Sequence, residues 1–305
     1  MAVYRGLDIG TAKPSRSSTA GRHGEGPGPT GAPSGPRWHL LDLVEPEEEF
    51  SVAQFQQAAV AALGSIRGRG HHAVLVGGTG LYHRAVVDGL ELPGRFPAIA
   101  ADLEEEAEGG PASVAALHRR LGDLDPVAAS RIDPANRRRI VRALEVTLGS
   151  GRGFSSFGPG LEHYPAHRIR LAGLRLERAE LIRRLAGRLD AQLASGWLDE
   201  VRELASRPGG LSRTAAQAIG YRELLEVVAE GRPLSSARDA ILVRLRAFAR
   251  RQEAWFQRDP RVRWFEADSP RLAEDVTEFF VAGDSGQRAP DPAGGAERAW
   301  ETGAR

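Results

Sequence analysis

An apolar run that ends in a glycine-rich turn is the feature that most constrains the fold of this chain. Residues 73–76 read Ala-Val-Leu-Val, and residues 77–80 read Gly-Gly-Thr-Gly. A short apolar run closed by such a turn predicts a buried strand, and residues 81–87 are expected to form a helix after it. Because a helix is also expected before the strand, this order is typical of an open α/β sheet, which binds ligands at the carboxyl ends of its strands.

Capping residues and apolar spacing predict the neighbouring elements. Ser51 with Gln54 three residues later is a capping box, so a helix is expected to start there. Leucines recur every fourth residue from Leu181 to Leu193, which predicts a long helix that Gly196 ends. Further helices are expected over residues 215–229 and 236–256, and strands near residues 169–174 and 262–265.

Changes in composition divide the chain into four expected parts. Residues 1–95 are the first part of the α/β core, 96–165 a helical insertion, 166–281 the second part of the core with C-terminal helices, and 282–305 a disordered tail. Within the first part, residues 14–36 are rich in Gly, Pro, Ser and Arg and lack apolar periodicity. They are expected to form a mobile loop.

The overall composition excludes several classes of site. The chain carries 41 basic and 40 acidic side chains, so any affinity for RNA must come from local clusters. It contains no cysteine, which excludes disulfides and zinc–thiolate sites, and its histidines show no metal-ligand spacing, so no residue is assigned to a metal. Apolar runs are far shorter than the roughly 20 residues that span a bilayer, and the first residues do not resemble a signal peptide. We therefore expect a cytoplasmic protein with no membrane partner.

Six motifs follow one another in the order of a known family. They are Tyr4–Pro14 (YRGLDIGTAKP), His39–Asp42, Val76–Tyr82, Arg139–Val146, Ala218–Glu223 and Arg250–Phe256. In this order they resemble the tRNA dimethylallyltransferases, also called tRNA isopentenyltransferases or IPP transferases. The resemblance spans roughly residues 2–268.

The resemblance implies a fold and an activity. The implied fold is a parallel sheet like that of P-loop NTPases, which bind nucleotides such as ATP. A helical insertion domain that binds tRNA is added to it. The activity is transfer of a dimethylallyl group from dimethylallyl diphosphate to N6 of adenosine 37 in tRNA, with magnesium as cofactor and release of diphosphate. The implied partner is the anticodon stem-loop, and the implied state is a monomer.

Two motifs of that family are missing. A glycine-rich phosphate loop that ends in Gly-Lys-Ser or Gly-Lys-Thr should precede an Asp-Ser-x-Gln motif, whose aspartate is the implied base. Lys13 is the only lysine and follows Ala12, so no stretch of this chain is a Walker A loop. Met1 and Ala2 align with the last two residues of Asp-Ser-x-Gln.

We therefore expect that the first strand, the P-loop, its helix and the catalytic aspartate lie upstream of Met1 and that the start of the gene is misassigned. No catalytic residue is assigned within the chain. As written it is expected to be inactive, to expose an apolar sheet edge and to be poorly soluble.

Candidate ligand contacts lie in the resembling motifs. The N–H groups of Gly77 and Gly78 and the Thr79 hydroxyl are expected to bind substrate phosphate or the target nucleotide, although a plain tight turn has the same pattern. Lys13 is expected either to meet phosphate as a point charge or to be an exposed loop lysine. Arg222 either binds diphosphate or tRNA or pairs with Glu226, four residues on. Tyr221 lies beside Arg222 in the same Ile-Gly-Tyr-Arg motif and is a candidate substrate contact.

Two arginine clusters are candidate RNA contacts. Arg138, Arg139 and Arg142 lie on about one turn of an expected helix and are expected to pair with anticodon-stem phosphates, although a solvated basic face is the usual reason for such a cluster. Arg244, Arg250 and Arg251 lie on the last long expected helix and are expected to line the RNA channel, with Gln252 available to read or orient a base.

Three hypotheses remain open from the sequence. The first is a dimethylallyltransferase. The second is a catalytically inactive tRNA-binding remnant that lacks the P-loop and the catalytic aspartate. The third is a small-molecule kinase of related P-loop architecture, against which the missing loop and the arginine-rich insertion both argue.

Overall fold

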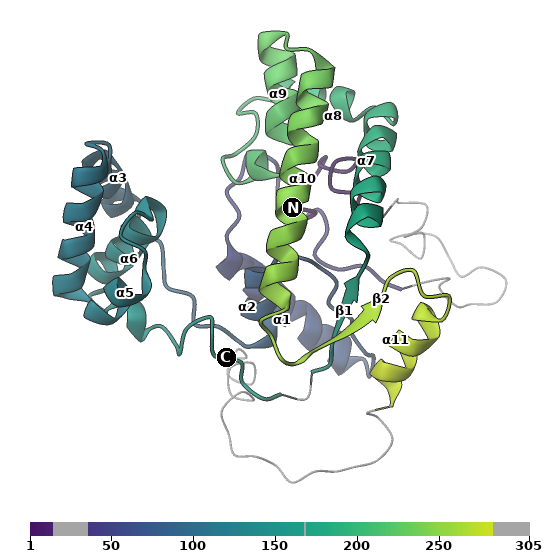
Figure 1. Cartoon of the computed structure of the whole chain (residues 1–305), viewed down its shortest axis with the longest axis horizontal. Coiled ribbons are helices and arrows are strands. Elements are labelled where there is room, and N and C mark those ends of the chain that lie inside the picture. Colours follow the sequence, from purple (N-terminus) through teal and green to yellow (C-terminus); the bar gives the residue numbers. More distant parts are fainter. Residues whose placement is uncertain (15–35, 168, 283–305) are drawn as a thin grey trace. The chain divides into compact units, whose positions relative to one another are not determined.

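The computed structural model describes residues 1–14, 36–167 and 169–282 (Figure 1). The expected loop over residues 14–36 and the expected tail over 282–305 lie almost wholly outside these residues. The chain divides into two compact units. Unit 1 contains residues 1–83 and the chain from 169 onward, and unit 2 contains residues 84–168. No helix in the described ranges is long and apolar enough to cross a membrane.

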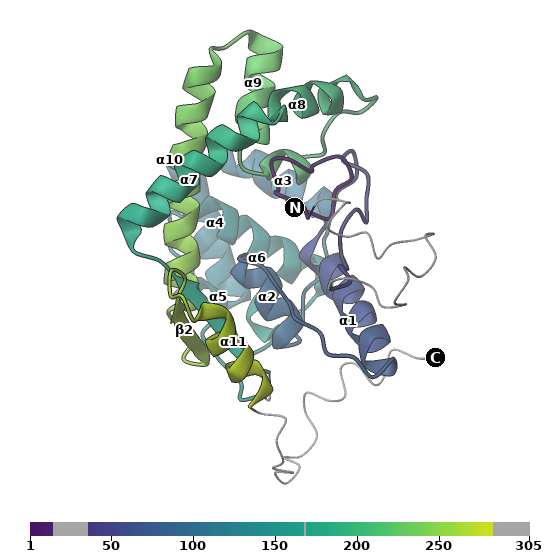
Figure 2. The same ribbon diagram turned by 90° about the vertical axis from the view of Figure 1, so that its right-hand side faces the viewer.

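Unit 1 is built from helices and one small parallel sheet. Its elements are α1 (Val52–Gly68), the start of α2 (Gly80–Val87), β1 (Leu171–Arg175), α7 (Arg178–Ala194), α8 (Trp197–Ser206), the short 3₁₀ helix η2 (Ala215–Gln217), α9 (Tyr221–Glu230), α10 (Leu234–Phe256), β2 (Val262–Glu266) and α11 (Leu272–Val281). Helix α10 packs on α7 and α9, and α8 packs on α7 and α9 (Figure 2).

The expected strands after residue 168 are confirmed. β1 pairs with β2 in parallel, in a register that places Leu171 opposite Val262 and Arg175 opposite Glu266. The expected helix start at Ser51 is also confirmed. Its hydroxyl accepts a hydrogen bond from the Gln54 N–H, and the Gln54 side chain accepts one from the Ser51 N–H, so both halves of the capping box are present.

The buried strand expected over residues 73–76 does not form. The segment has no regular structure, and the side chains of Val74 and Val76 are 70% and 74% exposed. A strand needs a partner for its N–H and C=O groups, and no described segment pairs with this one. The apolar residues that should be buried in a sheet therefore face outward. Leu174 on β1 is likewise 56% exposed, so apolar sheet residues are exposed in unit 1.

The core of unit 1 lies around Trp197 at the start of α8. This side chain is 2% exposed and meets the fully buried Tyr221 edge-on, with ring centroids 5.6 Å apart. Leu7 from the N-terminal segment, Leu189 of α7 and Ile241 of α10 are buried in the same cluster. The core thus joins the N-terminal segment to four helices from the C-terminal half of the chain, α7, α8, α9 and α10.

Unit 2 is a helical bundle with its own core. Its helices are the rest of α2, α3 (Pro97–Ala107), α4 (Pro111–Leu124), α5 (Pro126–Arg131) and α6 (Arg137–Ser150), followed by the 3₁₀ helix η1 (Phe154–Ser156). Helices α3, α4 and α5 each begin with proline, which fits the first helical turn because that turn has no partner for its N–H. Ile140 and Leu144 of α6 are fully buried against Leu117 and Leu121 of α4.

Asp125 caps helix α5 and ties it to η1. Its carboxylate accepts hydrogen bonds from the Ala128 N–H at 3.0 Å and from the Ser155 N–H and hydroxyl at 2.7 Å each. Burial raises the pKa of Asp125, but these hydrogen bonds outweigh it and hold the pKa below the ordinary value of 3.8. A lowered pKa in the folded state means that the carboxylate contributes stability above the unfolded pKa. That contribution is lost as the pH falls through the folded pKa.

This cap predicts that unit 2 becomes less stable in acid. Asp125→Ala is expected to lower the free energy of unfolding by about 1–2 kcal/mol at neutral pH, since it removes an N-cap. Asp125→Asn removes the carboxyl group that titrates. The unfolding free energy of this variant should therefore decrease less below pH 3.8 than that of the unaltered protein. Thermal unfolding as a function of pH measures both. Asp123→Asn, at an exposed position on α4, is the matched control, and an equal effect from it would contradict the assignment.

Candidate functional site

The glycine turn and helix α10 come together in unit 1. The Gln252 side-chain amide donates a hydrogen bond to the Gly78 carbonyl at 2.9 Å. A Cβ added to Gly80 would lie 2.1 Å from Nε1 of Trp255, so only glycine allows this approach. The resembling motifs around residues 76–82 and 250–256 are therefore packed against each other.

Aromatic contacts extend this packing on both sides of the turn. Tyr82 meets Phe55 of α1 with ring centroids 5.0 Å apart, and His83 meets Phe256 of α10 edge-on at 5.6 Å. Thr79 itself is exposed, and among the described residues its hydroxyl has no hydrogen-bond partner. The turn thus presents a free hydroxyl from a firmly held backbone.

The N-terminal motif is anchored to α8 by Glu200. One carboxylate oxygen accepts the N–H groups of Asp8 and Ile9 at 3.0 and 2.7 Å, and the other accepts the Tyr221 hydroxyl at 2.6 Å. Trp197 fills the space between Gly10 and Gly220, where added Cβ atoms would lie 2.4 and 2.1 Å from its ring. The motifs over residues 4–14 and 218–223 therefore meet through two residues of α8.

Tyr221 is placed differently from the sequence expectation. It was a candidate substrate contact, but its side chain is fully buried and its hydroxyl is used by Glu200. Burial, together with that hydrogen bond to a carboxylate, raises the pKa of Tyr221 far above its ordinary value of 10.0. The residue positions the motif from within the core and presents no group at the surface.

Lys13 lies in a cluster of ion pairs and not in an open loop. Its ammonium is 2.7 Å from Asp8 and 2.5 Å from Asp42, and its side chain is only 5% exposed. It also donates to the Tyr4 carbonyl. The exposed lysine that the sequence offered as one alternative is therefore wrong, because these acceptors cover the charge. The cluster joins the first two resembling motifs, 4–14 and 39–42.

Strained backbone surrounds the same lysine. Ala12, Leu40 and Asp42 have φ values of 50°, 63° and 53°, and they are the described residues other than glycine with positive φ. Such conformations persist only where surrounding contacts hold them. The ion pairs of Lys13 and the parallel bridge between Tyr4 and Val44 supply those contacts.

Arg222 stays at the surface beside a paired carboxylate. Its guanidinium lies 3.7 Å from Glu223, and its side chain is 65% exposed. Glu223 is already engaged by Arg244 at 2.5 Å, while Glu226, the partner offered by the sequence, pairs with Arg232 at 2.7 Å. The alternative of an Arg222–Glu226 pair is therefore wrong. Arg251 on α10 is also exposed, and no described residue forms an ion pair with it.

The three candidate arginines of unit 2 fall into two kinds. Arg138 and Arg139 are exposed on α6 without an ion pair to a described residue. Arg142 instead donates to the carbonyls of Pro93 and Gly94 at 2.9 and 3.0 Å, and it pairs with Glu145 at 2.7 Å. Arg138 and Arg139 are thus available to bind an anion, whereas Arg142 holds the segment that precedes α3.

Sequence reasoning missed Glu200 and Trp197, which hold two of the motifs. Trp197 follows the helix-ending Gly196, and a large aromatic residue directly after a helix break indicates packing. No local signal marks Glu200, because its partners lie about 190 and 20 residues away in the sequence and pairing at that distance is set by the fold.

The chain matches known proteins over nearly all of its length. A family model described as IPP transferase matches residues 2–259. The tRNA dimethylallyltransferase of a Nocardioides species is 41% identical over 283 residues, which cover 92% of this chain and 86% of that protein. That of Streptomyces coelicolor is 41% identical over 285 residues, which cover 91% and 85%.

Solved structures give the same result. The tRNA isopentenylpyrophosphate transferase of Bacillus halodurans has a TM-score of 0.60 at 32% identity, over 92% of this chain and 85% of that one. A eukaryotic dimethylallyltransferase acting on tRNA has a TM-score of 0.68 over 95% and 74%, and at 20% identity it shows the fold alone. The α/β arrangement of helices with a small parallel sheet is that of these proteins, and the chain therefore belongs to the IPP transferase family, whose members matched here are tRNA dimethylallyltransferases.

Proposed function

We propose that this protein transfers the dimethylallyl group of dimethylallyl diphosphate to N6 of adenosine 37 in a tRNA anticodon stem-loop and releases diphosphate. The observation that carries the proposal is the packing of the glycine turn on α10, which brings two motifs of the family together and leaves Thr79 free to bind a ligand. Matches that cover 86% of a relative's length support an enzyme over an RNA-binding remnant.

The reaction sets physical demands that the described residues meet in part. The bond from the allylic carbon to the diphosphate oxygen breaks, a bond from that carbon to N6 forms, and one N6 proton leaves. The departing diphosphate needs positive charge and aimed N–H donors. The exposed Arg222 and the turn around Gly78 are the groups that we assign to it. N6 is reached only if the base leaves its stack. Gln252, which donates a hydrogen bond to the Gly78 carbonyl, is the residue that we assign to contact with such a base.

The resemblance to the family implies magnesium as a cofactor. Mg²⁺ takes oxygen ligands and often shares them with substrate phosphates. No group of three or more His, Asp or Glu residues in the described ranges is placed to hold a metal ion. The described side chains therefore do not form a complete magnesium site.

We propose that the parallel β1–β2 pair belongs to a P-loop NTPase-like core, and that unit 2 is the tRNA-binding insertion. The protein would act as a monomer in the cytoplasm, where tRNA is modified. The short parallel sheet supports the proposed core, and the exposed arginines of α6 support the tRNA-binding role of unit 2.

RNA binding by unit 2 predicts a change in salt dependence. Each arginine that neutralises a phosphate contributes about 1 to the slope of log affinity against log salt concentration. The double variant R138A/R139A is expected to reduce that slope by about 2 and to weaken stem-loop binding at low salt. Fluorescence anisotropy with a labelled stem-loop over a salt series measures it. R188A removes an exposed arginine of α7, and it should leave the slope unchanged. An equal change in R188A would contradict a specific contact.

The activity itself is tested on synthetic anticodon stem-loops. The protein, dimethylallyl diphosphate and Mg²⁺ are incubated with RNA that carries adenosine at position 37, and digested nucleosides are identified by liquid chromatography and mass spectrometry. The expected product is N6-dimethylallyl adenosine. RNA with guanosine at the same position is the control, because it offers no N6 amine, and equal modification of both RNAs would overturn the proposal.

A further inference from the structure

Glu223 is a buried carboxylate on which two arginines converge. Its side chain is 5% exposed and lies in the first turn of α9. One oxygen accepts the Gly220 N–H at 3.1 Å. The other accepts a hydrogen bond from Arg244 of α10 at 2.5 Å and lies 3.7 Å from the guanidinium of Arg222. The arginine that we assign to the diphosphate is therefore next to a carboxylate that can also bind it.

Arg244 is the cation that neutralises this carboxylate. A separation of 2.5 Å is that of a charge-assisted hydrogen bond, whereas 3.7 Å is too long for one. The sequence predicted that Arg244 lines the RNA channel, but in the structure its guanidinium is held by Glu223. The Arg222 side chain is 65% exposed. Arg222 therefore stays in solvent, out of hydrogen-bonding distance of the carboxylate.

The charge of Glu223 would need a different partner without Arg244. A buried carboxylate is costly unless it is paired with a cation, and Arg222 is the other cation that the described residues place beside it. A guanidinium group donates in pairs to a carboxylate, as it does to a phosphate. Loss of Arg244 would therefore draw Arg222 onto Glu223 and occupy the donors that a diphosphate needs.

We propose that Arg244 is a positioning residue for the transfer reaction, because it neutralises Glu223 and thereby keeps Arg222 available to the diphosphate. Arg244 acts through Arg222 and does not itself contact the diphosphate. This inference rests on the proposed function, which assigns Arg222 to the departing diphosphate. It explains how a buried carboxylate can lie beside an anion-binding arginine, since the Glu223–Arg244 pair carries no net charge.

Titration of inorganic diphosphate into the full chain by calorimetry tests the inference. R244M is expected to weaken diphosphate binding by about tenfold or more, because Glu223 then takes the donors of Arg222 and hydrogen bonds to a charged group are lost. The double variant E223Q/R244M should restore the affinity almost to that of the unaltered protein. The glutamine still accepts the Gly220 N–H through its carbonyl oxygen, but it carries no charge that could draw Arg222 away.

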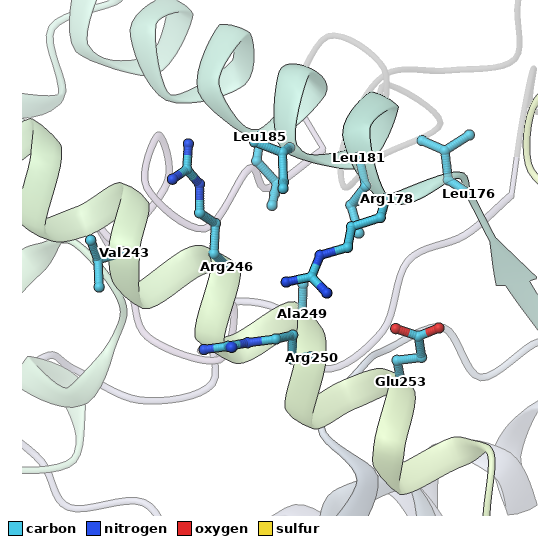
Figure 3. A pocket seen from close by; sticks show the side chains of 10 residues that line it. Leu176, Arg178, Leu181, Leu185, Val243, Arg246, Ala249, Arg250 and Glu253 are labelled. Carbon is cyan, nitrogen blue, oxygen red and sulfur yellow. The ribbon is translucent and has the colours of Figure 1, made fainter.

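Two further variants separate this effect from a general loss of structure. R222M should weaken diphosphate binding by itself, and adding R244M to it should have no further effect, because Arg244 acts through Arg222. R246M is the matched control on α10. Figure 3 shows Arg246 projecting from α10 on the side of α7, where it lines a groove. Residues two positions apart on a helix do not share a face, so R246M should leave the affinity unchanged.

Three results would overturn the inference. The first is unchanged diphosphate affinity in R244M. The second is a loss that persists in E223Q/R244M, which would mean that Arg244 contacts the diphosphate directly. The third is unchanged affinity in R222M. If R244M unfolds at a lower temperature than the unaltered protein, R244Q takes its place. It still donates a hydrogen bond to Glu223 but lacks the charge, and it should also weaken diphosphate binding.

The inference and the proposed function fail in different ways. If the chain modifies RNA while R244M binds diphosphate normally, only the role of Arg244 is wrong. If R244M weakens diphosphate binding and E223Q/R244M restores it, but no RNA is modified, only the proposed function is wrong.

Discussion

Trp197→Ala is expected to lower the free energy of unfolding of unit 1 by about 3–5 kcal/mol, the usual cost of removing a large aromatic residue from a core. The ring is 2% exposed and stacks edge-on against Tyr221. It also fills the space between Gly10 and Gly220, where no other described side chain comes as close. A cavity at this point would separate two motifs that belong to the candidate site.

Chemical denaturation followed by far-UV circular dichroism measures this loss. Trp38→Ala is the matched control, because Trp38 is 43% exposed and a surface substitution usually changes stability by no more than about 0.5 kcal/mol. We also expect slower RNA modification in the Trp197 variant, since the 4–14 segment would lose its anchor. If both variants unfold at the same denaturant concentration, the packing described around Trp197 is wrong.

Gly80→Ala is expected to have the second largest effect, through the contact between the glycine turn and α10. An added Cβ would lie 2.1 Å from the indole nitrogen of Trp255 and 2.2 Å from its Cδ1 atom. The indole ring is rigid, so the turn and the helix must move apart. Overpacking of this kind costs about 1–3 kcal/mol. The hydrogen bond from Gln252 to the Gly78 carbonyl would be strained by the same movement.

Gly64→Ala, on helix α1, is the control for this experiment. A Cβ added at Gly64 meets no atom within 4 Å, so the same chemical change should not lower stability and should leave activity close to that of the unaltered protein. We expect Gly80→Ala to lower the rate of RNA modification more than its loss of stability explains, because Thr79 would be displaced. Equal rates in the two glycine variants would contradict a role for the turn.

Local signals in the sequence predicted most helices and both strands of the sheet. The capping box at Ser51 and the leucine spacing of α7 are encoded within a few residues, and β1 and β2 form where alternation or an apolar run indicated them. The helix expected over residues 215–229 is interrupted, because Gly220 has a φ of 97° and α9 starts only after it.

Features that depend on distant partners could not be predicted. The run at residues 73–76 has the composition of a buried strand, but pairing requires another strand beside it, and the described residues provide none. Lys13 and Tyr221 looked like ligand contacts within their motifs. Their partners, Asp42 and Glu200, lie elsewhere in the sequence, so only the folded structure shows that these polar groups are already used.

The sequence predicted which motifs form the candidate site, but it did not predict how these motifs are arranged in space. Thr79 and Gln252 were both identified from the sequence, and the contact that joins their segments is seen only in the structure.

Transfer of the prenyl group in a single turnover tests the central claim most directly. Labelled dimethylallyl diphosphate is mixed with excess protein and an anticodon stem-loop, and RNA-bound label and free diphosphate are followed in the same samples. We predict that both appear at the same rate and in equal amounts, and only with adenosine at position 37. Saturable binding of the stem-loop without any label in the RNA would contradict the account, and would favour the RNA-binding protein without catalysis that the missing phosphate loop suggested.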